Sequence, residues 1–334
     1  MKKTKWGIIA AGGIALRRTI PVMDLCEYGE IVAVMDRNPA PLQYIKETYG
    51  IQATYTDEDE MLANPEVEAV YIASPVFCHL EQAKKVLKAG KHLLLEKPMG
   101  LDYKEAVELA EFVKDYPNLK VGIAMIMRMH PVHQKIRELV KDGVLGDVIS
   151  ARSQFVCDFP DIENDWRQKK VTGGGGTLVD MGVHCIDLLR YVLDDDVKQV
   201  YGDICTKTYH YEVDDSADCL LRMKKGATCF VEAHFNIPEE TTTGILELYG
   251  TKASIVARGT IGQEGTGEVI LTTKEGAEPI TYNFENVYAA QISAFSRAIM
   301  EDGEVSTTVE HALETARVVD ALYRSAKEER VVKL

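Results

Sequence analysis

The chain has 334 residues, which exceeds the usual size of one domain, so we expect two domains with a ligand-binding cleft. Hydrophobic residues make up 46% and charged residues 27%, the balance of a globular protein with a sizeable core. The formal net charge of -14 argues against nucleic acid as a partner. We find no apolar run of roughly 18 residues and no signal-peptide pattern, so we expect a cytoplasmic protein with no membrane partner.

The seven cysteines are scattered and none is spaced as CxxC, so we expect small, reduced core thiols. His130 and His133 flank Pro131 without nearby acids or cysteines. Structural zinc needs clustered thiolates or imidazoles, so we interpret both as ordinary histidines on a helix surface. The sequence therefore predicts no metal site.

Residues 1–127 alternate short apolar runs with longer amphipathic stretches, which is the pattern of repeated βαβ units. The predicted strands are 6–10, 31–36, 69–73, 92–96 and 121–127, and the predicted helices are 15–26, 41–49, 80–89 and 103–116. Near-continuous hydrophobicity in the strands favours a parallel sheet covered on both faces. We predict an α/β N-terminal Rossmann domain with a parallel, doubly wound sheet over residues 1–127, which binds a dinucleotide.

Residues 128–334 have a different pattern, with many short runs in which hydrophobic and polar residues alternate. The predicted helices are 131–141, 178–193, 288–301 and 309–327, and the predicted strands are 197–208, 216–223, 228–236, 244–249, 253–257, 268–273 and 279–282. Alternation is typical of antiparallel strands with one buried face. We predict an α+β C-terminal domain with a large, mostly antiparallel open sheet over residues 128–334.

A turn of small residues lies between the first predicted strand and the first predicted helix, in segment 7–15. Against the dinucleotide pattern G-x-G-x-x-G/A, the key positions are Ala10, Gly12 and Ala15, so the first glycine is missing. Unpaired N–H groups at a helix N-terminus bind phosphates when nearby side chains are small. We predict cofactor contacts for Ala10, Gly12, Gly13, Ile14 and Ala15, although a turn without a ligand fits this segment equally well.

The second predicted strand ends in Asp36, roughly 20 residues beyond the turn, where the adenosine ribose of a dinucleotide is bound. A carboxylate accepts the two ribose hydroxyls and repels a 2′-phosphate, so Asp36 favours NAD. The neighbouring Arg37 can pair with that phosphate and leaves NADP open. A polar loop with a helix cap is the alternative interpretation of both residues.

Several later segments together resemble one family. They are residues 73–79, Ala-Ser-Pro-Val-Phe-Cys-His; Glu96-Lys97-Pro98; Arg128-x-x-Pro131; Asp165-Trp166-Arg167; and Gly174-Gly175-Gly176 followed by Asp180, His184 and Asp187. In this order they are similar to the Gfo/Idh/MocA oxidoreductases, a family that includes glucose-fructose oxidoreductase and inositol dehydrogenase. The match covers nearly the whole chain and both predicted domains.

The resemblance implies an NAD(P)-dependent dehydrogenase or reductase that moves a hydride between nicotinamide and a CH–OH carbon of a sugar, polyol or inositol-like substrate. It implies that residues 128–334 serve substrate binding and oligomerisation, with a homodimer or homotetramer paired through the open sheet. For the cofactor it adds Ser74, Pro75, His79, Glu96 and Lys97 to the predicted contacts. For the small polyhydroxylated substrate it implies Lys97, Arg128, Trp166, Arg167, Asp180 and His184.

The chemistry of three of these residues fits catalysis. Lys97 follows a predicted parallel strand at the edge where open α/β sheets bind ligands, and Pro98 constrains its backbone. Its ammonium can stabilise a developing alkoxide. Asp180 and His184 are four residues apart on a predicted helix and share one face, so His184 can take the hydroxyl proton while Asp180 orients it or holds a neighbouring hydroxyl.

Other readings of these residues stay open. Lys97 can be a surface lysine, and His184 and Asp187 can be ordinary helix residues that are satisfied by packing. Trp166 and Arg167 serve equally well as a domain-surface anchor, and His79 as a helix cap. At the level of function, an NAD-dependent glycosidase that oxidises transiently and eliminates an aglycone keeps the same fold and cofactor. A non-catalytic dinucleotide sensor is the third possibility.

Overall fold

The computed structural model describes residues 2–334 and divides into two compact units. The first unit runs to Met125 and also contains Tyr288–Leu313, and the second comprises Ile126–Val287 and Glu314–Leu334. The predicted division at 127/128 assigned residues 288–313 to the second domain. They pack with the first unit because Ile292 and Phe295 are buried in its hydrophobic core.

The first unit is built on a six-stranded sheet with the order β3-β2-β1-β4-β5-β6. All neighbouring strands pair in parallel, as a Rossmann fold requires. The strands are β1 (Thr4–Ile9), β2 (Gly29–Met35), β3 (Ala53–Tyr55), β4 (Ala69–Ile72), β5 (His92–Glu96) and β6 (Val121–Ala124). The predicted fold class of this unit is confirmed.

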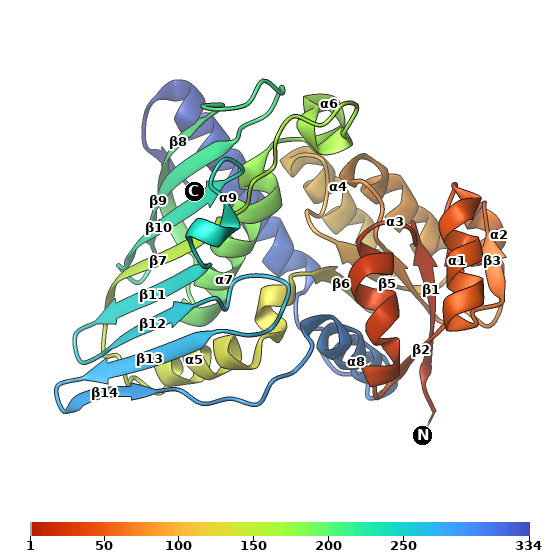
Figure 1. The fold of residues 1–334 in the computed structure, drawn as a ribbon, viewed down its shortest axis with the longest axis horizontal. Coiled ribbons are helices and arrows are strands. Elements are labelled where there is room, and N and C mark those ends of the chain that lie inside the picture. Colours follow the sequence, from red (N-terminus) through yellow and green to blue (C-terminus); the bar gives the residue numbers. More distant parts are fainter. Residues whose placement is uncertain (1) are drawn as a thin grey trace. The chain divides into compact units, whose positions relative to one another are not determined.

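Helical segments accompany these strands, and all of them except the last in the chain connect one strand to the next (Figure 1). They are η1 (Ala15–Thr19), η2 (Ile20–Leu25), α1 (Pro39–Tyr49), α2 (Glu58–Leu62), η3 (Val76–Cys78), α3 (His79–Lys88), α4 (Tyr103–Val113) and, from later in the chain, α8 (Val287–Met300). The helix predicted at 15–26 forms as a π-helical turn followed by a 3-10 helix, η1 and η2. Pro21 lies at the start of η2 and lacks the N–H that a regular α-helix would use there.

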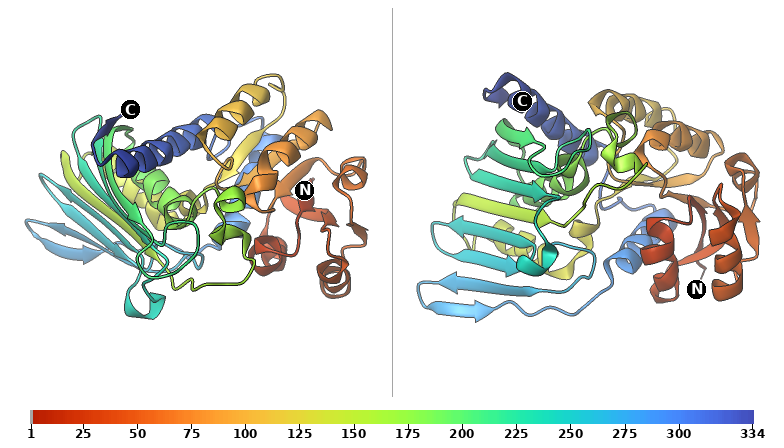
Figure 2. Two further views of the ribbon diagram at one scale, coloured as in Figure 1. Left: turned by 90° about the horizontal axis from the view of Figure 1, so that it is seen from above. Right: turned by 45° about the horizontal axis from the view of Figure 1, so that its top comes forward.

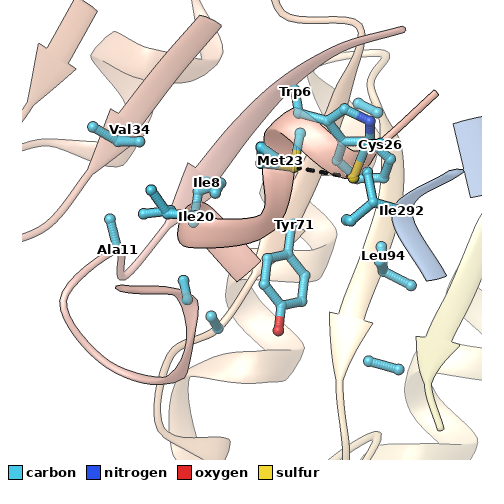
Figure 3. Packing of buried hydrophobic residues seen from close by; sticks show 14 of the residues in the cluster. Trp6, Ile8, Ala11, Ile20, Met23, Cys26, Val34, Tyr71, Leu94 and Ile292 are labelled. Carbon is cyan, nitrogen blue, oxygen red and sulfur yellow. Dashed lines mark hydrogen bonds between the residues drawn. The ribbon is translucent and has the colours of Figure 1, made fainter. Parts of the chain in front are cut away.

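One hydrophobic core covers the sheet face that packs against η2, α1 and α8. Trp6 and Phe295 form its aromatic centre, with ring centroids 5.5 Å apart. Figure 3 shows Trp6, Met23, Cys26 and Ile292 packed together, with the hydroxyl of Tyr71 directed away from them. That hydroxyl points toward the carboxyl ends of the strands.

The second unit is built on a nine-stranded sheet with the order β14-β13-β12-β11-β7-β10-β9-β8-β15. Its strands are β7 (Val148–Val156), β8 (Val197–Cys205), β9 (Ser216–Met223), β10 (Thr228–His234), β11 (Ile245–Gly250), β12 (Ser254–Arg258), β13 (Glu268–Thr273), β14 (Gly276–Pro279) and β15 (Val332–Lys333). β7 pairs with β10 in parallel and every other pairing is antiparallel. The predicted mostly antiparallel sheet is confirmed, although its central strand β7 was not predicted.

The helical segments of this unit are η4 (Ile126–Met129), α5 (Pro131–Lys141), η5 (Trp166–Gln168), α6 (Lys170–Gly173), η6 (Leu178–Gly182), α7 (Val183–Leu193), η7 (Glu239–Thr241) and the greater part of α9 (Val309–Glu328). The three long helices, α5, α7 and α9, lie on one face of the sheet, and within residues 2–334 no α-helix of the unit covers the other face (Figure 2). α7 packs on β7 and β10 and so lies over the middle of the sheet.

His130 and His133 are not on a helix surface as expected. They are 1% and 0% exposed, and their ring centroids lie 4.8 Å apart at the start of α5, with the ring planes tilted by 39°. His133 Nδ1 lies 2.7 Å from the Met127 carbonyl and Nε2 lies 3.0 Å from Thr260 Oγ1, so it ties α5 to a loop of the sheet. Burial, together with the neighbouring His130, lowers the pKa of His133 to about 3, so this pair is neutral and structural.

The seven cysteines are all free. In the part of the chain that the structure describes, no group of three His, Cys, Asp or Glu side chains is placed to hold a metal ion. None of the helices in residues 2–334 is long and apolar enough to cross a membrane.

Candidate active site

The turn after β1 is shaped by close backbone contacts. Ala10 has a φ of 61°, in the left-handed region that favours glycine, and the dinucleotide pattern has glycine at this position. A Cβ on Gly12 would lie 2.9 Å from both Asp36 Oδ2 and Pro41 Cγ, so this position takes no side chain. A Cβ on Gly13 would meet a single atom within 4 Å, the Ala73 carbonyl oxygen at 3.9 Å. The turn is therefore open above Gly13, as a pyrophosphate requires.

Asp36 is fixed against this turn at the end of β2. Gly12 N donates to Asp36 Oδ2 at 2.8 Å and Asn38 N donates to Oδ1 at 2.9 Å. The carboxylate therefore stays where the ribose of a dinucleotide would lie, and each oxygen keeps a lone pair for a ribose hydroxyl. Arg37 is exposed on the neighbouring surface. The bare turn and the oriented carboxylate fit NAD.

The loop after β4 meets this turn, because β1 and β4 are neighbours at the point where the strand order reverses. Ala73 N donates to the Ile9 carbonyl at 3.0 Å, which holds the two chain segments together. Ser74 and Pro75 follow directly, and Ser74 is buried. Of the other predicted cofactor residues, Ala15 is buried in the first helical turn and Ile14 is half-buried.

Lys97 follows β5 at the same edge of the sheet. Its backbone N–H donates to Glu96 Oε2 at 3.2 Å, and the other oxygen of Glu96 accepts a hydrogen bond from the Tyr71 hydroxyl. Tyr71 is 1% exposed. Burial, together with the carboxylate of Glu96, raises the pKa of Tyr71 far above its ordinary value, so the hydroxyl stays protonated and donates a hydrogen bond to Glu96. The Lys97–Pro98 peptide bond is cis.

In the second unit, Asp180 and His184 lie on the continuous helical segment formed by η6 and α7, as predicted, but its first part is π-helical. Asp180 is half-buried in the π turn. His184 is 6% exposed, and its ring centroid lies 6.1 Å from that of Phe155 on β7. The two side chains therefore belong to one helical end that rests on the middle of the sheet.

Sequence reasoning missed Asp214, which caps this helical end. Its carboxylate accepts from Gly176 N and Leu178 N, both at 2.9 Å, and from the Tyr323 hydroxyl at 2.7 Å. A Cβ on Gly176 would lie 1.8 Å from the Asp214 carbonyl oxygen, which explains the glycine there. The hydrogen bond between Gly176 and Asp214 joins residues 38 apart in the chain. The run of glycines was the one feature of the sequence that pointed to a close contact there.

The predicted substrate residue Arg128 is 4% exposed and forms a bidentate ion pair with Asp187, with Nε and Nη2 each 2.7 Å from a carboxylate oxygen. Thr315 Oγ1 lies 3.4 Å from the same carboxylate. The Arg128–Asp187 pair thus ties η4 to α7 inside the second unit. Asp187, for which packing and ligand contact were equally plausible, has a packing role.

Trp166 and Arg167 lie in η5, and both are half-buried. The Arg167 guanidinium lies 4.3 Å from the centroid of the Trp166 ring, which is a cation–π distance. Asp165 caps this short helix by accepting from Arg167 N at 2.7 Å. One indole face is therefore covered by Arg167, and a sugar ring would have to use the other face.

Two family models match the chain. "Oxidoreductase family, NAD-binding Rossmann fold" matches residues 4–125, and "GFO/IDH/MocA C-terminal domain" matches residues 133–256. The 1,5-anhydro-D-fructose reductase of Ensifer adhaerens is 28% identical over 307 residues, 92% of this chain and 91% of that protein. The D-xylose 1-dehydrogenase (NADP(+)) 2 of Haloferax volcanii is 28% identical over 332 residues, 98% of this chain and 99% of that protein.

Solved structures agree. The aldose-aldose oxidoreductase from Caulobacter crescentus, complexed with glycerol, superimposes with a TM-score of 0.93 at 25% identity. The match covers 100% of this chain and 100% of that protein. Levoglucosan dehydrogenase in complex with NADH and levoglucosan has a TM-score of 0.89 at 23% identity over 99% of each chain, which supports the fold. A Rossmann unit with this second unit defines a nicotinamide-dependent oxidoreductase. The chain belongs to the Gfo/Idh/MocA family.

Proposed function

We propose that this enzyme transfers a hydride between NAD and a CH–OH carbon of a sugar or polyol, with Lys97, Asp180 and His184 acting on that carbon. The observation that carries the proposal is the constrained presentation of Lys97 at the sheet edge that also bears the dinucleotide turn. Two full-length relatives are named as a reductase of an anhydro sugar and a dehydrogenase of xylose, which supports a sugar as the substrate class.

Each group has a distinct role in this proposal. The bound nicotinamide supplies the hydride acceptor or donor. The Lys97 ammonium donates a hydrogen bond to the reacting oxygen and stabilises negative charge on it. His184 takes the hydroxyl proton in the oxidative direction and returns it in the reverse direction, and Asp180 orients the ring or holds an adjacent hydroxyl.

The remaining predicted residues act in binding. We assign Trp166 and Arg167 to the hydroxyl groups of the substrate, because a guanidinium on an indole face still presents several N–H donors. Arg128 is assigned a positioning role instead of direct substrate contact, since Asp187 occupies its Nε and Nη2.

We also propose that NAD is preferred over NADP. Asp36 is held by two backbone N–H groups, so it cannot easily turn away from a 2′-phosphate to let Arg37 pair with it. A cytoplasmic location is supported by the seven free cysteines, because reduced thiols persist in that compartment.

Assembly through the open sheet face into a homodimer or homotetramer is a further part of the proposal. Tyr201, Leu220 and Phe230 lie side by side on that face, because each is paired in register with the next. Tyr201 and Phe230 are 43% and 42% exposed, which is unusual for aromatic residues on a solvated sheet. Arg152 is the next residue in this row and forms an ion pair with Glu232. The pair offers one positive and one negative charge to a second copy of the chain.

The test is a panel of sugars, polyols and inositols, with nicotinamide absorbance and product release both followed. We expect at least one substrate to change the redox state of the cofactor, and the change to be lost in Lys97→Ala. The control Lys104→Ala removes an exposed lysine from α4 and should behave as the unmodified enzyme. Net hydrolysis of a glycoside without cofactor consumption would assign the enzyme to the glycosidase reaction. Cofactor binding without any turnover would favour a sensor.

A further inference from the structure

The ring of His79 bridges two loops of the first unit. His79 begins α3 and is 1% exposed, so it has almost no surface to offer a cofactor. Its Nδ1 lies 2.8 Å from the Pro98 carbonyl oxygen, and its Nε2 lies 2.9 Å from the Ser74 carbonyl oxygen. Ser74 belongs to the loop after β4 and Pro98 to the loop after β5. The imidazole therefore joins the two loops that leave the sheet beside the dinucleotide turn.

The Ser74 end of this bridge is anchored independently of His79. Ser74 Oγ donates to Gln82 Oε1 at 2.6 Å, and Gln82 Nε2 donates to Glu58 Oε2 at 2.7 Å. Lys85 Nζ binds the other oxygen of Glu58 at 2.6 Å. Ser74, Gln82 and Glu58 are all buried, so this chain of bonds fixes the Ser74 loop on α2 and α3.

The Pro98 end carries Lys97. On its N-terminal side, the Lys97 backbone is held by Glu96, which Tyr71 holds in turn. On its C-terminal side, the carbonyl of the following residue, Pro98, lies against the ring of His79. The backbone that presents the Lys97 side chain is thus held from both directions by buried or half-buried groups.

We propose that His79 is a positioning residue for Lys97, which donates a hydrogen bond from Nδ1 to the Pro98 carbonyl and so fixes the loop that presents the ammonium. Burial lowers the pKa of His79 below its ordinary value of 6.5, although both carbonyls oppose this, so the ring is neutral and carries one N–H. We assign that N–H to Nδ1, because its contact with the Pro98 carbonyl is the shorter of the two, 2.8 Å against 2.9 Å from Nε2 to the Ser74 carbonyl. The inference rests on the proposed function, since it requires Lys97 at the reacting oxygen.

Two variants separate positioning from packing. The amide nitrogen of Asn reaches the position of Nδ1, and that of Gln reaches the position of Nε2, while both remove the ring. We expect His79→Asn to keep kcat within about threefold and His79→Gln to lower it about 100-fold, because a loop displaced by about 1 Å misplaces the reacting groups. The dissociation constant for NADH should be the same in both variants. Equal losses of kcat in the two variants would overturn the proposal.

Two further measurements complete the test. Neutron diffraction from crystals of the unmodified enzyme locates the proton on the ring and needs no variant to fold. Deuterium on Nδ1, directed at Pro98, is the expected result, and a bare Nδ1 would contradict the proposal. Lys97→Ala is assayed in parallel to separate the two proposals. Undiminished turnover in Lys97→Ala would contradict the proposed function itself. If Lys97→Ala loses turnover while His79→Asn and His79→Gln have equal effects, only the positioning role of His79 is contradicted.

Discussion

Ala10 occupies the one position of the dinucleotide turn where the chain departs from glycine and also adopts a left-handed backbone, with a φ of 61°. An L side chain costs about 1–2 kcal/mol in that region. Its methyl group does not prevent the turn from forming, because the neighbouring Gly12 takes the close approach to Asp36. The strain is therefore local and can be removed by one substitution.

We predict that Ala10→Gly raises the free energy of unfolding by up to about 1 kcal/mol, since relief of the left-handed strain exceeds the entropic cost of glycine. NADH binding should be unchanged or tighter. The measurement is the urea midpoint of both proteins. Ala40→Gly in α1 is the control and should shift stability the other way, as glycine does in a helix. A destabilised Ala10→Gly would mean that the turn is not strained.

Asp36 allows a prediction about cofactor choice. Asp36→Ser removes the carboxylate that accepts hydrogen bonds from Gly12 N and Asn38 N. Because this carboxylate is also proposed to bind the ribose, the dissociation constant for NADH should rise about tenfold or more. NADPH, which loses a repulsive charge, should bind as well as before or better. Fluorescence titration of both nucleotides gives the ratio. An unchanged ratio of the two affinities would place the ribose away from Asp36.

Sequence could predict a residue where its neighbours along the chain define its role. Asp36 and Lys97 follow parallel strands, and this alone places them at the ligand-binding edge. Residues whose roles depend on distant partners could not be predicted. The ion pair of Arg128 with Asp187 joins residues 59 apart in the chain, and the two carbonyls around His79 come from separate loops.

At the scale of elements, the helical segment η6–α7 begins with a capped π turn that depends on glycine. We predict that Gly176→Ala lowers the free energy of unfolding by about 3 kcal/mol or more, because its Cβ would lie 1.8 Å from the Asp214 carbonyl oxygen and must displace backbone. Turnover should fall with it, since the backbone N–H of Asp180 donates to the Gly176 carbonyl at 3.0 Å. Gly303→Ala is the control, where the added Cβ would have a nearest contact of 3.8 Å. Equal melting temperatures for the two variants would contradict the capping role.

The attachment of α5 through His133 gives the stability a pH dependence. The folded pKa of His133 is about 3 and the unfolded value is 6.5, so the unfolded chain binds the proton first as the pH falls. The stability present above pH 6.5 is therefore lost on acidification, by about 2 kcal/mol between pH 6.5 and pH 5. Urea midpoints at several pH values measure it. His133→Gln should flatten this part of the profile, and an unaltered profile would assign the effect to other groups.

The strand missed by sequence reasoning, β7, shows why some elements are hard to predict. Its core-facing positions include Ala151 and Ser153, which are fully buried but are small or polar. The hydrophobic alternation that identifies a half-buried strand is therefore weak. By contrast, α5, β9 and β13 were predicted with their observed bounds, because their apolar residues follow one clear period.

At the scale of the whole molecule, the chain returns to the first unit after building most of the second, and its last residues, Glu314–Leu334, belong to the second unit again. The sequence showed a change of texture near residue 127 but gave no sign that α8 packs beside β1, since an amphipathic helix does not indicate which core it will cover. The open sheet face of the second unit raises a similar question, because alternation alone fits a solvated or a paired face.

We predict that the open face pairs in solution. Phe230→Lys places a charge in the middle of the row formed by Tyr201, Leu220 and Phe230, and should shift the enzyme to a smaller species in sedimentation velocity. Phe284→Lys changes an aromatic residue that is 63% exposed in a loop of the same unit, and should leave the assembly intact. If the unmodified enzyme sediments as a monomer, this face is not an interface.

The central claim is that Lys97 and His184 serve one chemical step. A double-mutant cycle on kcat/KM with Lys97→Ala, His184→Ala and the combined variant tests it most directly. Groups that act on the same transition state are strongly non-additive, so we expect the combined variant to be about as slow as the slower single variant. Losses that multiply as independent effects, or a single variant that retains full kcat/KM, would contradict the account.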